Sequence, residues 1–114
     1  EFTKNPESKL EFASGYFNPN PRLGNILQNS KSQVEILTAS PSANGFYRAG
    51  RVKSHIPKFY RLVEETFLKS QNGNSSIFEY NRSDWTFHAK GMWLSENQNQ
   101  NPFMTVVGSS NYSM

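Results

Sequence analysis

Residues 85–94 read Trp-Thr-Phe-His-Ala-Lys-Gly-Met-Trp-Leu, and residues 103–111 read Phe-Met-Thr-Val-Val-Gly-Ser-Ser-Asn. Both stretches are rich in the aromatic and β-branched residues typical of strands, and the polar run 95–102 between them predicts a hairpin-like loop. Side chains two residues apart on a strand point to the same face. The pattern therefore predicts that His88 and Lys90 project side by side.

An imidazole beside an ammonium suits the binding of a phosphate group. Lysine neutralises phosphate oxygens, while histidine attacks phosphorus or transfers a proton near neutral pH. Hydroxyl, amide and backbone N–H groups of residues 108–111 can donate to the same oxygens. If the two strands are neighbours, His88, Lys90 and Asn111 meet around one anion and stabilise a pentacoordinate phosphorus without a metal. No residues have metal-ligand spacing, so we expect neither metal nor cofactor.

The rest of the chain alternates strand-like and helix-like segments. Strands are predicted at residues 10–17, 33–39, 77–80, 86–94 and 103–107, and helices at residues 22–29 and 56–69. This order indicates an α/β fold in which a mixed β-sheet is flanked by helices. We expect Trp85, Phe87 and Trp93 to share one strand face and to form core.

Composition narrows the function only slightly. The 114 residues include 12 basic and 9 acidic side chains, a formal charge of +3, and no cysteine. This weak positive charge is compatible with phosphate-bearing substrates or an anionic membrane surface, but it is too small to indicate nucleic acid. No apolar run approaches the roughly 20 residues of a membrane-spanning helix.

The chain reads as part of a longer protein, because it stops directly behind a predicted strand. Residues 1–9 are polar and contain Pro6, which predicts a tail or linker. Residues 10–114 would then form a partial domain.

The two motifs together, His88-x-Lys90 and then Gly108-Ser-Ser-Asn111 after an apolar strand, resemble the signature of the phospholipase D superfamily. The longer stretch 81–94 is similar to the eukaryotic, mitochondrial phosphatidylglycerophosphate synthase branch, and residues 38–46 resemble a block upstream of its motif. The likeness runs from about residue 10 to the end of the chain. It implies a phospholipase D-like half-domain.

The resemblance implies a phosphatidyltransferase. Such enzymes move the phosphatidyl group from CDP-diacylglycerol to glycerol 3-phosphate and release CMP, on the route to phosphatidylglycerol and cardiolipin. They use two His-x-Lys motifs, and this chain carries what looks like the second, so the first would lie in a missing N-terminal half. It also implies a peripheral membrane enzyme on the matrix side of the mitochondrial inner membrane, with no nucleic-acid partner.

Site roles follow from the same resemblance. His88 would act as the acid and base, while Lys90, Asn111 and Ser109 would hold phosphate oxygens. The superfamily places an aspartate five residues after the lysine, where this chain has Ser95. Either Glu96 supplies that carboxylate or this branch dispenses with it.

Asn44 is a further candidate for substrate contact, because it lies in a loop after a strand, where α/β proteins build their sites. Two other functions stay open. One is a nucleic-acid phosphodiesterase of the tyrosyl-DNA type, whose motifs also lack the aspartate. The other is that this chain is inactive on its own, because half of a two-motif site should not turn over.

Overall fold

Five strands form one mixed sheet in the computed structural model, which describes residues 2–45, 56–70 and 73–110. The sheet order is β3-β2-β1-β4-β5, with β1, β2 and β3 parallel and β4 antiparallel to both of its neighbours. The strands are β1 Lys9–Ser14, β2 Gln33–Ala39, β3 Ser75–Tyr80, β4 Lys90–Ser95 and β5 Met104–Val107. The mixed α/β sheet expected from the sequence is confirmed.

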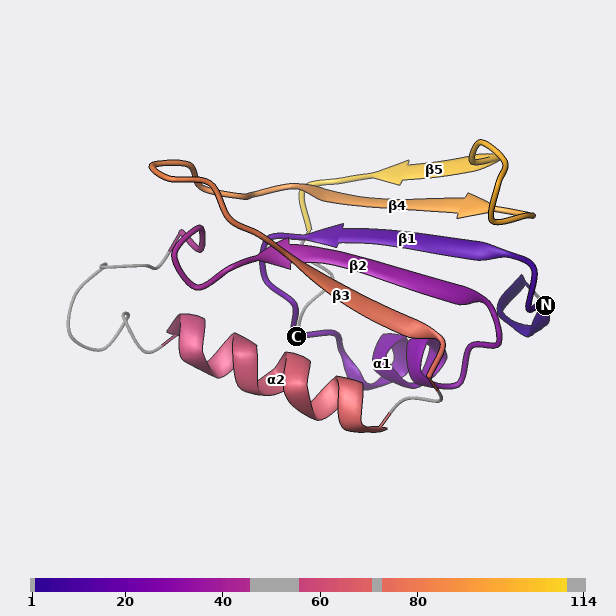
Figure 1. The fold of residues 1–114 in the computed structure, drawn as a ribbon, viewed down its shortest axis with the longest axis horizontal. Coiled ribbons are helices and arrows are strands. Elements are labelled where there is room, and N and C mark those ends of the chain that lie inside the picture. The colour runs from indigo at the N-terminus through magenta and orange to yellow at the C-terminus, as the bar shows by residue number, and fades with distance from the viewer. Residues whose placement is uncertain (1, 46–55, 71–72, 111–114) are drawn as a thin grey trace.

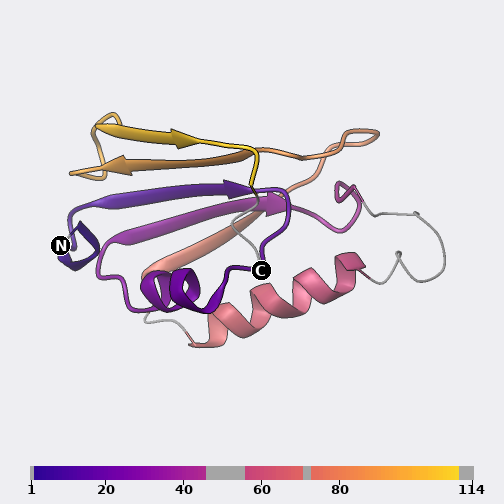
Figure 2. The same ribbon diagram turned by 180° about the vertical axis from the view of Figure 1, so that it is seen from behind.

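Two helices, α1 Pro21–Gln28 and α2 Ile56–Ser70, lie on the same face of this sheet (Figures 1 and 2). At the start of α1, the Asn20 side chain accepts a hydrogen bond from the Leu23 N–H at 2.9 Å. Pro21 occupies the first turn, where a missing N–H costs nothing. Both predicted helices are confirmed, and each of their ends lies within about one residue of the predicted position.

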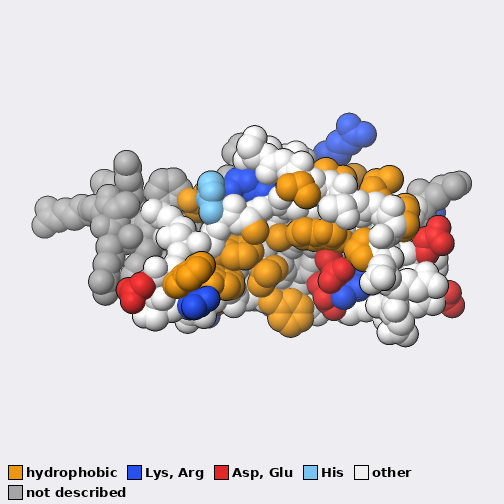
Figure 3. Space-filling view, turned by 90° about the horizontal axis from the view of Figure 1, so that it is seen from above, with side chains coloured by type: hydrophobic (Ala, Val, Ile, Leu, Met, Phe, Trp, Pro, Cys, Tyr) orange, Lys and Arg blue, Asp and Glu red, His pale blue; other side chains and the backbone are white. Residues whose placement is uncertain are grey.

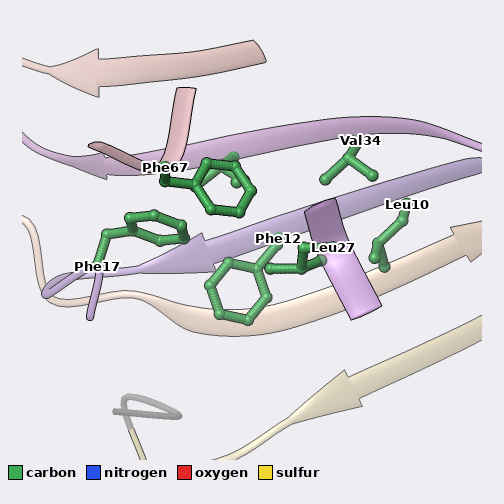
Figure 4. Packing of buried hydrophobic residues seen from close by; sticks show 7 residues of the cluster. Leu10, Phe12, Phe17, Leu27, Val34 and Phe67 are labelled. Atoms are coloured by element: carbon green, nitrogen blue, oxygen red, sulfur yellow. The ribbon is translucent and has the colours of Figure 1, made fainter. Parts of the chain in front are cut away.

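The core lies between the helices and the sheet. Alternate residues of β1 and β2 point into it, and one side chain from each helix together with Phe17 completes it (Figure 4). Its buried members are Leu10, Phe12, Phe17, Leu27, Val34, Ile36 and Phe67. Each such side chain contributes about 1.5–3 kcal/mol by leaving water, so this face holds the domain together.

The opposite face of the sheet carries no helix in residues 2–45, 56–70 and 73–110. Leu37, Phe78 and Trp93 line a shallow apolar hollow of about 610 Å³ on this face, and hydrophobic side chains form a band across it (Figure 3). Phe87 lines the same hollow, so it shares a face with Trp93 as predicted, but neither residue belongs to the buried core. Trp85 does not line the hollow: it is 55% exposed, so its prediction as core is wrong.

The strand predicted at 86–94 begins only at Lys90. The preceding residues are held by loops instead of a strand ladder: the Phe87 N–H donates to the Ala43 carbonyl and the Gly15 N–H donates to the Ala89 carbonyl, both at 3.0 Å. His88 consequently lies just before β4. The alternation rule that placed it beside Lys90 does not apply to it directly.

Residues 2–8 pack against the domain. A 3-10 helix, η1, spans Phe2–Lys4, and Phe2 contacts the core. The buried Ser8 and Ser32 hydroxyls lie 2.6 Å apart. The first residues described are thus folded, while the domain boundary at residue 10 stays a prediction.

Candidate active site at one edge of the sheet

The predicted phosphate-binding residues lie where strands of both directions meet. The carboxyl ends of β1, β2 and β3 share one edge of the sheet, and β4 begins and β5 ends there, because Ser14 pairs with Lys90 and Gly91 with Val107. The sheet therefore brings Gly108 and Ser109, which leave β5, beside the start of β4. Asn111 lies outside the described residues.

Three contacts fix the backbone that carries His88. Besides the bonds from Gly15 to Ala89 and from Phe87 to Ala43, the Phe87 ring stacks on Tyr80 at the end of β3, with ring centroids 5.0 Å apart. The histidine backbone is therefore tied to the ends of all three parallel strands. Such support suits a side chain that must be held in place for catalysis.

This arrangement requires glycine at position 15, because no side chain fits there. A Cβ at this position would lie 2.9 Å from the Phe87 carbonyl oxygen and 3.3 Å from the His88 Cα. Both are backbone atoms, which cannot rotate out of the way as a side chain can. The turn after β1 and the segment before β4 can approach this closely only with glycine.

The His88 imidazole packs against an aromatic pair. Its ring centroid lies 6.0 Å from that of Tyr16 in an edge-to-face arrangement, and Tyr16 stacks on Tyr60 of α2 at 5.4 Å. Burial, the larger effect, and the nearby Tyr16 raise the pKa of Tyr60 above its usual value. The imidazole itself belongs to an exposed residue, so it is supported from one side and open on the other.

Lys90 is half-buried beside His88. Its ammonium donates a hydrogen bond to the His88 carbonyl oxygen at 3.0 Å, and burial lowers the pKa of Lys90 below its usual value. The cation is thus held at the edge where the histidine lies. A phosphate group bound here would supply the opposite charge that favours the protonated amine.

The remaining candidates lie in two different places. Asn44 is buried in the loop after β2, at the same edge as His88. Glu96 follows the far end of β4, about 20 Å from Lys90 for six residues of extended chain. The structure therefore brings Asn44 to this edge and separates Glu96 from it. Ser95, which stands at the aspartate position of the family motif, is buried at that far end.

Beside the histidine lies a polar cavity of about 610 Å³. The loop after β2 and the loop after β3 form its walls, and the Ser42 hydroxyl joins them by donating to Asn81 at 2.9 Å. Its lining includes Asn44, Gly45, Arg82, Asp84, Trp85 and Thr86. In the described part of the chain, no group of three or more histidine or acidic side chains is placed to hold a metal ion.

Sequence reasoning missed Gly15, Tyr16 and Tyr60. The first two directly follow β1, and the carboxyl ends of parallel strands are where such folds build their sites, which was a usable signal. Tyr60 had no such signal, because it lies inside a helix and not at the end of a strand.

A buried carboxyl group on α2 makes stability depend on pH. Glu64 is 6% exposed, and burial, assisted by the charge of Glu79, raises its pKa to about 7. The folded state therefore favours the protonated form, and its stabilisation is complete below about pH 4.5 and is lost as pH rises through 7. We expect the free energy of unfolding to fall by on the order of 2 kcal/mol from pH 5 to 8, and Glu64→Gln to remove most of that fall.

Urea unfolding of the intact protein at several pH values measures this effect. Glu65→Gln, at the next and exposed position of α2, is the matched control and should keep the dependence. An unchanged pH slope in Glu64→Gln would contradict the role given to this carboxyl group.

Comparisons with known proteins give relatives in sequence and a solved structure with a similar fold. No family model matches the chain. It is 38% identical over 111 residues to a probable CDP-diacylglycerol–glycerol-3-phosphate 3-phosphatidyltransferase of Dictyostelium discoideum, and 40% identical over 110 residues to the enzyme of that name from Schizosaccharomyces pombe. The human relative, whose name adds mitochondrial, is 34% identical over 110 residues.

These alignments cover 93%, 94% and 92% of this chain but only 19%, 22% and 20% of the relatives. The chain thus spans about a fifth of the length of the curated relatives it matches. Among solved structures, phosphatidylserine synthase of Haemophilus influenzae is similar with a TM-score of 0.61 and 25% identity, over 76% of this chain and 22% of that one. Over most of its length the chain is therefore similar to part of the CDP-diacylglycerol–glycerol-3-phosphate 3-phosphatidyltransferases, and it shares the fold of part of a phosphatidylserine synthase.

Proposed function

We propose that the protein containing this chain transfers a phosphatidyl group from CDP-diacylglycerol to glycerol 3-phosphate, giving phosphatidylglycerophosphate and CMP. The names of the relatives supply the reaction. The observation that carries the proposal is the edge of the sheet at which His88, Lys90 and the chain leaving β5 lie together. These groups are suited to a phosphate whose negative charge grows during reaction.

In this proposal, His88 is the acid and base of the reaction. It donates a proton to the phosphate oxygen of the departing CMP, and it later accepts the proton of the attacking glycerol hydroxyl, so protons balance over one cycle. The nucleophilic histidine comes from the first His-x-Lys motif, in the half of the site that residues 10–114 do not contain. Lys90, Ser109 and Asn111 hold the non-bridging phosphate oxygens.

We also propose a peripheral enzyme at the matrix side of the mitochondrial inner membrane. The chicken and human relatives are named mitochondrial, and the donor is a lipid that stays in its bilayer. None of the described helices is long and apolar enough to cross a membrane. The positive formal charge of +3 is compatible with contact with anionic lipid headgroups.

The test uses the purified full-length protein with CDP-diacylglycerol in mixed micelles. We expect CMP to appear together with phosphatidylglycerophosphate, and only when glycerol 3-phosphate is supplied as acceptor. The 114-residue chain alone should not turn over. Cleavage of a 3′-tyrosyl DNA adduct without CMP release from CDP-diacylglycerol would replace this proposal by the phosphodiesterase alternative.

A further inference from the structure

The polar cavity beside His88 is connected to the histidine through two contacts. An added methyl group at Gly45, in the cavity wall, would lie 2.8 Å from the Tyr16 hydroxyl oxygen and 3.8 Å from the Thr86 methyl group. Tyr16 in turn contacts the His88 ring, and Thr86 precedes that histidine by two residues. The cavity wall at Gly45 therefore adjoins Tyr16, the residue against which the imidazole packs.

The lining of the cavity suits a small hydrophilic molecule that carries an anionic group. Hydroxyl and amide side chains make up most of the wall, with Arg82 as its cation and Asp84 as its carboxylate. Acyl chains would gain nothing from such surroundings. The volume of about 610 Å³ lies within the range of small-molecule sites, roughly 300–1,000 Å³.

The position of the Arg82 guanidinium suits the binding of a phosphate group. The guanidinium carbon lies over the Trp85 ring, 4.2 Å from the ring centroid, so the cation is held against the indole. In the part of the chain that the structure describes, no carboxylate forms an ion pair with Arg82. The N–H groups of the guanidinium can make a two-pronged bond to phosphate oxygens.

The cavity also holds a carboxylate, which is suited to bind the hydroxyl groups of a polyol. Asp84 has a backbone φ of 60°, a left-handed conformation that non-glycine residues rarely adopt and that is found at functional sites. The Ser83 hydroxyl donates to its carboxylate at 3.3 Å. The remaining carboxylate lone pairs can accept hydrogen bonds from sugar-like hydroxyl groups, which a phosphate alone does not have.

We propose that this cavity binds the phosphorylated acceptor, glycerol 3-phosphate, with Arg82 on its phosphate and Asp84 on its free hydroxyl. This inference rests on the transferase function proposed above. The shared chemistry, a phosphate on a small polar body, also describes the CMP end of the donor. The acceptor is favoured because Arg82 already covers a face of Trp85, the aromatic surface in this cavity on which a cytosine would stack.

The experiment is Arg82→Gln in the full-length enzyme, with Arg22→Gln, an exposed arginine on α1, as the matched control. We expect KM for glycerol 3-phosphate to rise about 10- to 50-fold in the first variant, while KM for CDP-diacylglycerol stays within about twofold. The preference for glycerol 3-phosphate over unphosphorylated glycerol should fall by a similar factor. Arg82→Lys keeps the positive charge but loses the planar guanidinium. Its KM for glycerol 3-phosphate should lie between those of the wild type and of Arg82→Gln.

Binding of glycerol 3-phosphate to the His88→Ala protein, measured by calorimetry, separates this inference from the proposed reaction. Weaker binding after Arg82→Gln supports the cavity even if the wild-type enzyme releases no CMP, a result that would defeat only the transferase proposal. If Arg82→Gln raised only the KM for CDP-diacylglycerol, the cavity would be assigned to the donor and the inference would be overturned. Unchanged affinity for both substrates would overturn it too. If Arg82→Gln does not fold, Arg82→Lys carries the same comparison.

Discussion

Replacing His88 by alanine is expected to lower kcat/KM for phosphatidyl transfer by about a thousandfold or more, while CDP-diacylglycerol still binds. General acid and base catalysis contributes about 10²–10⁴ to enzymatic rates, and in the proposed mechanism the variant removes the group that serves both half-reactions. The imidazole is exposed and contacts Tyr16 by an edge, so its loss leaves the core intact. CMP release from CDP-diacylglycerol is the measurement.

Two controls show that the variant loses the chemical step and not its fold or its donor site. It should still bind CDP-diacylglycerol in mixed micelles, and its circular dichroism spectrum should match that of the wild type. Asn101→Ala changes an exposed polar side chain in the loop at the far end of β4 and should keep wild-type turnover. Retained turnover in His88→Ala would end the assignment of this histidine as acid and base. A parallel loss in Asn101→Ala would indicate that the region responds to any change.

The fold could be predicted from the sequence because its signals are local. The residues of β1 and β2 that join the core cluster alternate along each strand. A helical period runs through Tyr60, Val63 and Phe67 of α2, so each element carries its own pattern. The error at residues 86–89 arose because their partners are Ala43 and Gly15, which are distant in sequence. A strand-like composition does not reveal whether its hydrogen bonds go to a strand or to loops.

The sequence predicts the candidate site only as far as the two motifs extend, and the roles of its residues stay predictions. His88 and Lys90 were identified from their spacing and chemistry, and the hairpin that brings residues 108 and 109 to them is confirmed. Their supports could not be predicted in the same way. The contacts of His88 with Tyr16, and of Tyr16 with Tyr60, depend on how the end of β1 meets α2 across the core, which no local pattern contains.

Gly15→Ala is expected to lower kcat by about a hundredfold while donor binding changes little. The new methyl group would lie 2.9 Å from the Phe87 carbonyl oxygen, so the segment that carries His88 must shift away from β1. A misplacement of about 1 Å at a catalytic group can cost about 10² in rate, whereas overpacking of this kind costs about 1–3 kcal/mol of stability. Steady-state kinetics and thermal unfolding of the same preparation measure both effects.

Gly24→Ala makes the same chemical change at a site with room for it. Among the described residues, a methyl group there would meet only the Pro19 ring, at 3.9 Å, and alanine favours the helix in which Gly24 lies. This control should keep its activity and unfold at an equal or higher temperature. If Gly15→Ala lost stability but kept kcat, the close approach at β1 would serve packing alone, because a displaced imidazole cannot keep the alignment that proton transfer requires.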